Sequence, residues 1–585
     1  MKIKHLFGLA VIAAMTASCS SNEYLGTPGT GTNEASVGYA TFTINLPSVS
    51  GSTTSGARGT RAGNPTYEQG TAKEYDVNDV TLLIFKKAGS SEGDYTFVEK
   101  ADLGTMAPWK DENNSNGITA SSTITAKLNN VALTSEGSTS DYYALAILNN
   151  NADATGEGKV KLPTGSDTYS SWNDAANAVV AKFTDNTKGF YMANAPVFVA
   201  GGEPTTLVNI NKVYATKQKA ETNAATTIYV ERGLAKVTVA TLPTGIKPSG
   251  TKYKDDEVDI TAWNLDVTNK STFPIHKTAG LKNTSFSTIW DNTTTSGASV
   301  TRFVDGSNPS FKRVHWGIDP NYNTALDNLS DCQGAFTILE PNEVINGTAA
   351  DPQYCLENTF DIEHMKQGQT TRVVFKATYT PNGFTKGETF YKIGNSTDLW
   401  KETNLIAQIT AKAQEVLSET DAHKVTVKLD ATENDIAGTA GTKILKEENV
   451  QHNGTNVSTD EINDINEKLG LKKAAGTDPI VGIATYKSGE SYYIARIKHF
   501  GVLTPWNEGE DTYGENNDAN NTKYLGRYGV LRNNWYELTV GSVSGPGTPD
   551  VPTIKPDVPD DESFRYISVS VKILSWAKRS STVDL

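Results

Sequence analysis

Residues 40–46 read Ala-Thr-Phe-Thr-Ile-Asn-Leu, and this stretch decides the class of fold. Every second side chain in it is apolar, and the side chains between are threonine or asparagine. This two-residue repeat is typical of a β-strand that buries one of its faces. Pro47, which has no backbone N–H to donate to a sheet, ends the strand. The residues of the expected buried face are Ala40, Phe42, Ile44 and Leu46.

The same alternation returns near the other end of the sequence, where residues 567–573 read Ile-Ser-Val-Ser-Val-Lys-Ile. Leu574 and Trp576 add apolar area to this second strand. It follows a proline-rich segment, residues 541–563, which is predicted to extend as a semi-rigid spacer because it cannot pair in a sheet. The strand is therefore expected to lie away from the domain that would normally bury it. Its alternating apolar residues are Ile567, Val569, Val571 and Ile573.

Further strand patterns occur along the chain, and they are separated by polar turns. A composition rich in Thr, Asn, Ser and Gly is typical of many short strands. Helical spacing is found at residues 171–183 and 405–417. Because 585 residues can form at least two large cores, the sequence predicts a mainly β protein with a few helices. The strand patterns are residues 77–85, 142–148, 227–239, 370–379, 491–499 and 535–540.

The first residues have the features of an export signal. Lys2 and Lys4 supply positive charge, and the apolar run that follows, residues 6–14, is too short to span a bilayer stably. Small residues then lead into Cys19, the pattern that a lipoprotein signal peptidase recognises before a diacylglycerol is attached to the cysteine. We therefore expect a lipid on Cys19 that tethers the chain to a membrane surface. The alternative is an ordinary secretory peptide in which the cysteine occurs by chance.

The net charge argues against some classes of partner. The formal charge is −14, and it becomes −16 once the segment through Arg61 is removed, because that segment holds four basic residues and two acidic ones. A charge of this sign argues against nucleic acid or an anionic membrane surface as a partner.

Two cysteines remain besides Cys19, and they leave two alternatives open. In an oxidising envelope Cys332 and Cys355 could form one disulfide that closes a loop of about two dozen residues, with a stabilisation of about 3 kcal/mol. They could equally be two unpaired thiols. The sequence has no CxxC motif and no Cys/His cluster, so no metal site is expected.

The sequence gives no sign of an enzyme. The seven histidines are scattered without HExxH spacing, and the chain has neither a GxSxG motif nor a phosphate-binding loop. No catalytic residue or cofactor is therefore expected.

The acidic run 508–521 could ligate calcium, but it lacks the EF-hand pattern and is more typical of a solvated loop. Trp506 and Tyr513 could contact sugars, which keeps a second hypothesis open, a monomeric, lipid-anchored glycan-binding surface protein.

Arg58 and Arg61 lie in a low-complexity stretch after the first strand, where a protease could reach them. If residues 40–46 first fill a groove in their own subunit, cleavage at Arg61 would release them. The vacated groove could then accept residues 567–573 of the next subunit, because an unpaired strand edge beside an apolar groove is a template for another chain. Repeated head to tail, this contact does not close and generates a filament. The alternative is that both strands pair permanently within their own chain.

Six segments carry a family resemblance. They are Thr60–Gly63, Val230–Lys236, His315–Tyr322, Tyr354–Thr359, Val530–Tyr536 and the ending, Ser568–Trp576 with Val583–Leu585. In this order they resemble the Bacteroidales fimbrillins of type V pili, in particular the shaft subunit of the short, or minor, fimbriae.

The resemblance implies a lipoprotein precursor that is carried to the outer membrane with its lipid on Cys19. It implies an arginine-specific protease that cuts between Arg61 and Ala62, followed by donor-strand exchange in which the C-terminal strand is the donor. The partners implied are further copies of the chain, accessory anchor and tip subunits, the protease and the outer membrane. The fold implied is two β-sandwich domains of transthyretin-like topology, and the mature form is expected in an adhesive fimbria on the cell surface.

The expected domain order follows from these assignments. The segments are a signal peptide (1–18), a lipidated propeptide with the removable strand (19–61), an N-terminal β-sandwich (62–241), a C-terminal β-sandwich (242–540), a proline-rich linker (541–563) and the donor strand (564–585).

Overall fold

The computed structural model describes most of the chain beyond its first 36 residues. No helix in this part is long and apolar enough to cross a membrane. The described residues are 37–47, 72–104, 106, 110–111, 118–151, 158–175, 183, 188–198, 204–279, 304–305, 313–314, 316–349, 351–394, 396–429, 442–472, 481–497, 499, 526, 528–560 and 567–575.

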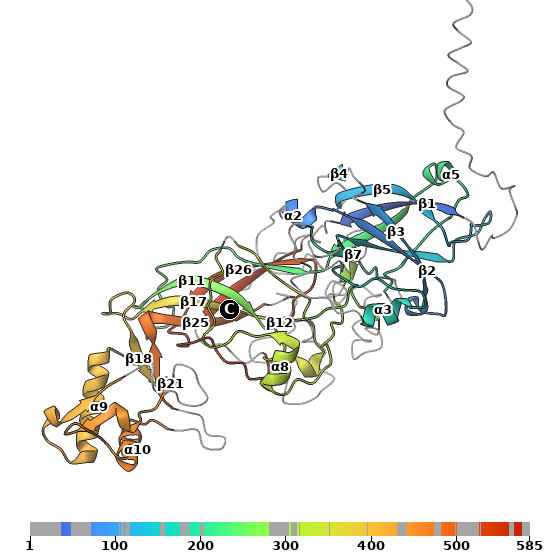
Figure 1. The fold of residues 1–585 in the computed structure, drawn as a ribbon. Coiled ribbons are helices and arrows are strands. Elements are labelled where there is room, and N and C mark those ends of the chain that lie inside the picture. Colours follow the sequence, from blue (N-terminus) through green and yellow to red (C-terminus); the bar gives the residue numbers. More distant parts are fainter. Residues whose placement is uncertain are drawn as a thin grey trace, which may run out of the picture.

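The first β-sandwich is formed by strands in the order β3-β2-β6-β7-β9-β1-β5-β4, with β8 paired to β6 (Figure 1). Side chains from β1, β2, β5, β6 and β9 share one apolar core, so the path of strands folds over into two facing layers. The strands are β1 (Gly38–Pro47), β2 (Val80–Lys86), β3 (Thr96–Gly104), β4 (Lys110–Asp111), β5 (Ile118–Leu128), β6 (Tyr142–Leu148), β7 (Met192–Asn194), β8 (Val208–Asn209) and β9 (Thr226–Arg232).

Helix α3 (Tyr169–Ala175) covers the other face of β2 and β6. Its Trp172 packs in a further core with Leu83 and Leu145, which is why β2 is buried along nearly its whole length. The helix expected at residues 171–183 begins here, and residues 176–182 lie outside the described part of the chain. The short helices α2 (Ala72–Tyr75) and α5 (Lys217–Glu221) also belong to this half of the molecule.

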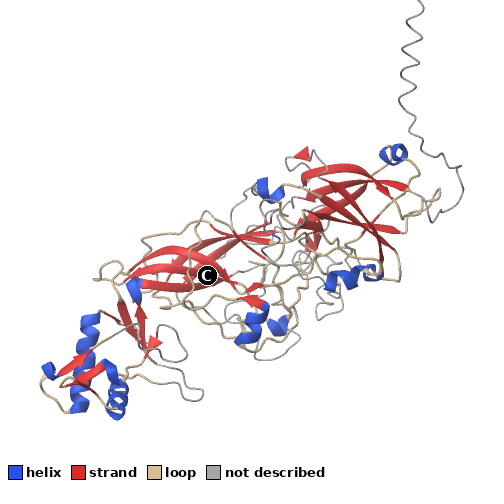
Figure 2. Cartoon of the chain, in the orientation of Figure 1, coloured by secondary structure: helices blue, strands red, loops and turns tan. Residues whose placement is uncertain are grey.

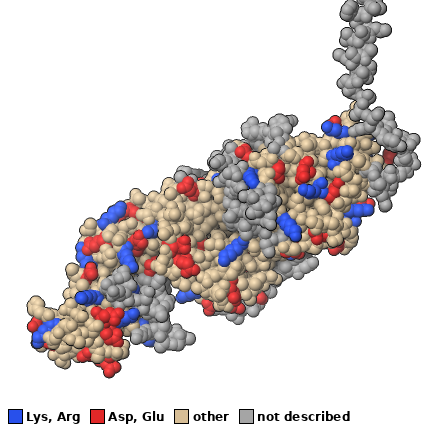
Figure 3. Space-filling model, viewed as in Figure 1, with Lys and Arg blue, Asp and Glu red and all other residues tan. Residues whose placement is uncertain are grey.

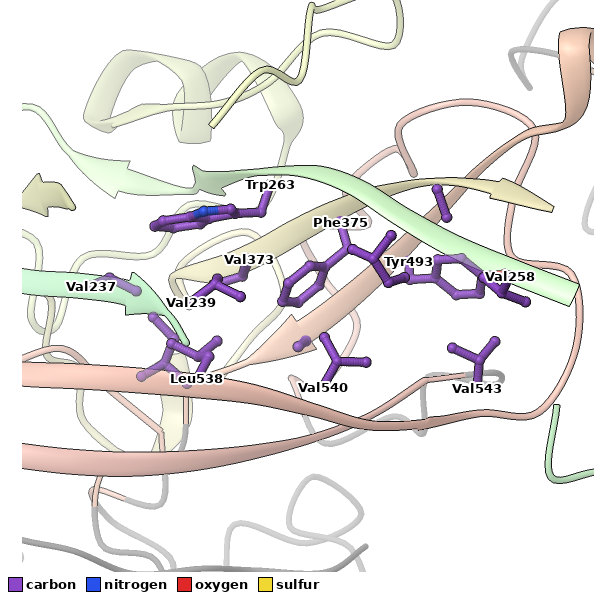
Figure 4. Close-up of a cluster of buried hydrophobic side chains, with 14 of the residues drawn as sticks. Val237, Val239, Val258, Trp263, Val373, Phe375, Tyr493, Leu538, Val540 and Val543 are labelled. Atoms are coloured by element: carbon purple, nitrogen blue, oxygen red, sulfur yellow. The ribbon is translucent and has the colours of Figure 1, made fainter. Parts of the chain in front are cut away.

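The second β-sandwich has one sheet in the order β16-β10-β26-β27 and a facing sheet in the order β11-β17-β25. Val237, Phe375 and Leu538 come from different strands and meet in the core between the sheets (Figure 4). The strands are β10 (Ala235–Val239), β11 (Glu257–Asp266), β16 (Gln353–Cys355), β17 (Arg372–Thr380), β25 (Glu490–Arg496), β26 (Asn534–Val543) and β27 (Ile567–Ser575). Shorter elements of the chain between β11 and β16 are β12 (Thr268–Asn269), β13 (Val304–Asp305), β14 (Arg313–Val314), α8 (Leu329–Ala335) and β15 (Phe336–Thr337).

The junction of the two sandwiches lies within the pattern at residues 227–239, which is two strands and not one. A Cβ atom on Gly233 would come within 2.8 Å of ring atoms of Phe183 and Tyr191, so only glycine fits there without movement of the rings. β9 before it belongs to the first sandwich and β10 after it to the second. The structure therefore places the change of domain near Gly233, earlier than the boundary expected at 241/242, because the strand pattern on both sides of Gly233 does not reveal which core each strand joins.

A smaller lobe with its own apolar core is inserted between β17 and β25, and the sequence did not predict it as a unit. Helix α9 in this lobe corresponds to the helix expected at residues 405–417. Figures 1 and 2 show the lobe and its helices at the end of the molecule remote from the first sandwich. Its elements are β18 (Phe390–Ile393), β19 (Leu399–Trp400), α9 (Glu402–Leu417), β20 (Val425–Val427), β21 (Thr442–Lys443), β22 (Val450–His452), β23 (Thr455–Asn456), α10 (Thr459–Lys468) and β24 (Ile483–Tyr486).

The proline-rich segment differs from the extended spacer that the sequence predicts. As far as Asp560 it is packed on the second sandwich, and Val551 and Ile554 are buried. Proline prevents regular strand pairing, but it does not prevent side chains and carbonyl groups from binding to a neighbouring surface. The mainly β fold with a few helices and two sandwiches is confirmed.

Figure 3 shows basic and acidic side chains interspersed over the face of the molecule that it draws.

Candidate strand-exchange site

Strand β1 lies inside its sheet, hydrogen bonded on both sides. It pairs with β5 in antiparallel orientation over its whole length, from Gly38 to Pro47. On its other side, Phe42–Asn45 pair in parallel orientation with β9. A strand in this position can leave only if both ladders break.

The inward face of β1 is formed by the four residues that the sequence predicts. Ala40, Phe42, Ile44 and Leu46 are exposed by 1%, 0%, 0% and 2%, and they belong to the core of the first sandwich. Burial of a large apolar side chain contributes about 1.5–3 kcal/mol, so the three large ones together contribute about 5–9 kcal/mol. This is comparable with the net stability of a whole domain.

The outward face of β1 carries hydroxyl pairs that fix its register on β5. The Thr41 and Thr125 hydroxyl oxygens are 2.8 Å apart, and those of Thr43 and Thr123 are also 2.8 Å apart. A slip by one residue would turn these hydroxyl groups into the core and the apolar side chains into water.

Strand β27 lies at the edge of its sheet. It runs antiparallel to β26 and, among the described strands, pairs with β26 alone. The predicted donor residues Ile567, Val569, Val571, Ile573 and Leu574 lie in β27, and Trp576 lies outside the described residues. The strand is therefore paired within its own subunit, as in the alternative in which both strands pair within their own chain. It lies at an edge of the sheet, however, so it can leave when the single ladder to β26 breaks.

The processing sites expected at Cys19, Arg58, Arg61 and Ala62 lie outside the described residues. The structure nevertheless fixes both ends of the segment that contains the arginines, since it leaves β1 after Pro47 and reaches α2 at Ala72. Cleavage after Arg61 would therefore separate β1 from every element that follows it in the sequence.

Glu74 in α2 attaches the chain to the junction of the sandwiches, independently of β1. Its carboxylate is 1% exposed and lies 2.8 Å from the Lys236 ammonium nitrogen, and it accepts a hydrogen bond from the Tyr354 hydroxyl at 2.5 Å. The Glu74 carbonyl oxygen accepts from Nε of Arg232 at 2.8 Å. None of these three contacts involves a residue of β1.

The sequence did not identify this junction as a site, although three of the resembling segments meet there. The backbone N–H of Arg232 donates to Oδ1 of Asn533 at 3.3 Å. Nε of Arg532 lies 3.2 Å from the Glu357 carboxylate. The sequence signal that could have identified it is the high density of charged residues inside apolar strand patterns. A charged residue that is buried in such a position needs a partner of opposite charge.

Cys332 and Cys355 are free, buried thiols. Of the two alternatives, a disulfide or two unpaired thiols, the structure has the unpaired thiols. Cys332 packs beside Phe336, whereas Cys355 lies in the core of the second sandwich. Burial raises the pKa of Cys332 to about 11 and that of Cys355 to about 12. Both are therefore protonated and unreactive at neutral pH.

The described residues contain no group of three or more His, Cys, Asp or Glu side chains that could hold a metal ion. The acidic run 508–521 and the aromatic residues Trp506 and Tyr513 lie outside the described part of the chain. The calcium and sugar-contact hypotheses thus stay predictions.

A comparison with protein-family models finds a match for the region around β27. Residues 484–582, which include β25, β26 and β27, match the family model described as the C-terminal part of fimbrillin, the major fimbrial subunit protein type IV. No curated protein matches the chain.

Three solved structures with a fimbrial description align with the chain. A fimbrilin of Porphyromonas gingivalis W83 is 11% identical, covers 94% of this chain and 100% of its own, and gives a TM-score of 0.35. The tip fimbrial protein Mfa3 of Porphyromonas gingivalis is 9% identical, covers 91% of this chain and 99% of its own, and gives a TM-score of 0.26. A fimbrial assembly protein of Parabacteroides distasonis is 11% identical, covers 62% of this chain and 93% of its own, and gives a TM-score of 0.27. The sequence similarity to fimbrillins is the match over residues 484–582. Over this region, which contains the edge strand β27, the chain is similar to the C-terminal part of the fimbrillins.

Proposed function

We propose that this chain is the shaft subunit of a surface fimbria and that it polymerises by donor-strand exchange. The precursor is exported, lipidated at Cys19 and held at the outer membrane. An arginine-specific protease cuts it between Arg61 and Ala62, β1 leaves, and residues 567–576 of another copy enter the vacated groove. Anchor and tip subunits complete the fimbria, which mediates adhesion.

The position of β1 carries this proposal. β1 supplies a full row of core side chains, yet its only covalent link to the rest of the fold passes through the segment that contains Arg61. After a cut at that place only non-covalent contacts would hold it. Because its side chains contribute about as much as a domain's net stability, the sandwich then needs another strand of the same pattern.

The surface of the uncut molecule supports the same order of events. In the described part of the chain, the large apolar side chains that are exposed are Val37 (39%) and Val344 (71%). Few large apolar side chains of this part are thus open to water in the uncut molecule, and the groove that we propose as the acceptor is the one that β1 fills. Cleavage is then the step that starts assembly.

The test is digestion of the purified precursor with an arginine-specific protease. We expect ladders on gels run without heating and fibres in electron micrographs. A precursor without residues 567–585 should be cut but stay monomeric, and Val571→Asp should behave in the same way. Ser570→Asn, on the opposite face of the strand, is the matched control and should polymerise. The donor assignment is wrong if the shortened precursor polymerises as well as the full one.

A further inference from the structure

Residues 544–560, the strap, follow β26 and run along the open edge of β25. The Tyr493 hydroxyl donates to the Gly545 carbonyl oxygen at 3.1 Å, and the Tyr486 hydroxyl donates to that of Gly547 at 2.8 Å. Thr548 and Tyr492 exchange two backbone hydrogen bonds, of 2.8 and 2.9 Å. The first half of the strap thus caps the edge of the sheet as an additional strand would.

The middle of the strap inserts two aliphatic side chains into the body of the second sandwich. Val551 is 2% exposed and packs with Val374, and Ile554 is 4% exposed and packs with Phe336. Removal of the strap would expose these partners to water.

Two buried arginines bind the strap further along. Arg372, which is paired with Asp266 at 2.6 Å, donates through Nη2 to the Pro552 carbonyl oxygen at 2.6 Å. Arg496 donates through Nε to the Asp560 carbonyl oxygen at 3.0 Å. Burial lowers the pKa of Arg496 to about 10, and the negative charge of Asp560 opposes this shift. Without the strap these guanidinium groups would lose acceptors in a place where water is largely excluded.

Asp560 is the last fixed point of the strap. Its side chain is 1% exposed and accepts a hydrogen bond from the Thr370 hydroxyl at 2.8 Å, and its backbone N–H donates to the Met365 carbonyl oxygen at 3.0 Å. The backbone N–H of Gln367 donates to the Val558 carbonyl oxygen at 2.9 Å. β27 beyond it is held differently, by one edge ladder to β26.

We propose that the strap is a permanent part of the second sandwich and that exchange displaces β27 but not the strap. This inference rests on the proposed function, and it specifies where the partner copy must sit. The seven residue steps from Asp560 to Ile567 span at most about 25 Å. An arm free from Val543 onward could span about 75 Å in an extended polyproline conformation.

The acceptor groove of the next copy must therefore lie within about 25 Å of Asp560. Consecutive subunits then pack directly against each other, and the surface of the second sandwich around Asp560 contacts the next copy. Such direct packing gives a stiff shaft. A free arm would instead give domains joined by long flexible links.

Two engineered disulfides in the full-length precursor test the inference. Lys366→Cys with Pro559→Cys fixes the strap just before Asp560, since these residues form an antiparallel bridge. Thr539→Cys with Ser570→Cys fixes β27, since these residues are partners in its ladder with β26. Directly opposed residues of antiparallel strands are at a Cα distance suited to a disulfide. Each variant is digested with the arginine-specific protease in oxidised and in reduced form, so that the reduced form is its own folding control.

We expect the oxidised strap variant to polymerise within twofold of its reduced form, and the oxidised β27 variant to lose at least tenfold. Loss of polymer in the oxidised strap variant, with polymer restored on reduction, would overturn the inference while leaving the proposed function intact. Polymer from the oxidised β27 variant would overturn the proposed function itself. Hydrogen exchange on wild-type polymer is the independent measurement, and the amides of Thr548 and Asp560 should stay as protected as in the precursor.

Discussion

β1 and β27 share one sequence pattern, but their sheets hold them differently. β1 lies between β5 and β9 with its apolar face in the core. β27 lies at an edge, paired among the described strands with β26 alone. Alternation of apolar residues therefore shows that a strand has a face to bury, whereas the neighbours of the strand decide how readily it leaves.

The difference matches two ways of release. An edge strand can separate by local opening of one ladder while the rest of the sandwich stays folded. A central strand leaves only when two ladders break and a core opens, so in the proposed function it stays in place until a covalent cut makes its departure irreversible. We infer that proteolysis controls the acceptor end of the subunit and that the donor end is ready beforehand.

The largest effect should come from Phe42, whose ring is 0% exposed. Phe42→Ala should lower the free energy of unfolding of the uncut precursor by about 3–5 kcal/mol, because it leaves a cavity in the first core. Denaturant titration measures this loss. Deletion of residues 567–585 should lower it by less, since that removes an edge strand. An equal or larger loss on deletion would show that β27 is as firmly built in as β1.

The next effect concerns the point where the chain after β1 is fixed. Lys236→Met removes the ammonium group 2.8 Å from the buried Glu74 carboxylate, and loss of one partner of a buried pair costs about 3–5 kcal/mol. We expect about 3 kcal/mol, because the Tyr354 hydroxyl still donates to Glu74. Denaturant titration measures the change. The double variant with Glu74→Gln should recover part of the loss, and no recovery would mean that Lys236 acts through packing on Trp535, whose ring it also contacts.

The sequence predicted the strands well and their neighbours poorly. The buried face of β1 could be predicted because the period of two is a local property of the chain. The junction near Gly233, the inserted lobe and the fixed strap could not, because each depends on contacts between residues far apart in the sequence. Arg372, for example, reaches the carbonyl group of Pro552. A proline-rich stretch has the same local pattern whether it is free or bound.

A peptide should sharpen the comparison at the level of binding. A synthetic peptide of residues 38–47, added in excess during cleavage, should refill the groove and lower the yield of polymer by about tenfold. The same peptide with Phe42→Lys is the control and should have no effect, because a charge cannot be buried in that core. Gel ladders measure the yield, and equal inhibition by both peptides would contradict a role for the β1 groove.

The smallest effect should come from the hydroxyl pair of Thr43 and Thr123, which lies on the exposed face. Thr43→Val and Thr123→Val should each lower precursor stability by about 0.5–1 kcal/mol, the usual size of a cross-strand pair. In the polymer the two variants should differ, because Thr43 leaves with β1 whereas Thr123 remains on β5 opposite the incoming strand. With Ser570 in the place of Thr43, Thr123→Val should speed dissociation of the polymer about two- to fivefold, and Thr43→Val should not change it. An equal effect of both variants on the polymer would mean that β1 is still in its groove.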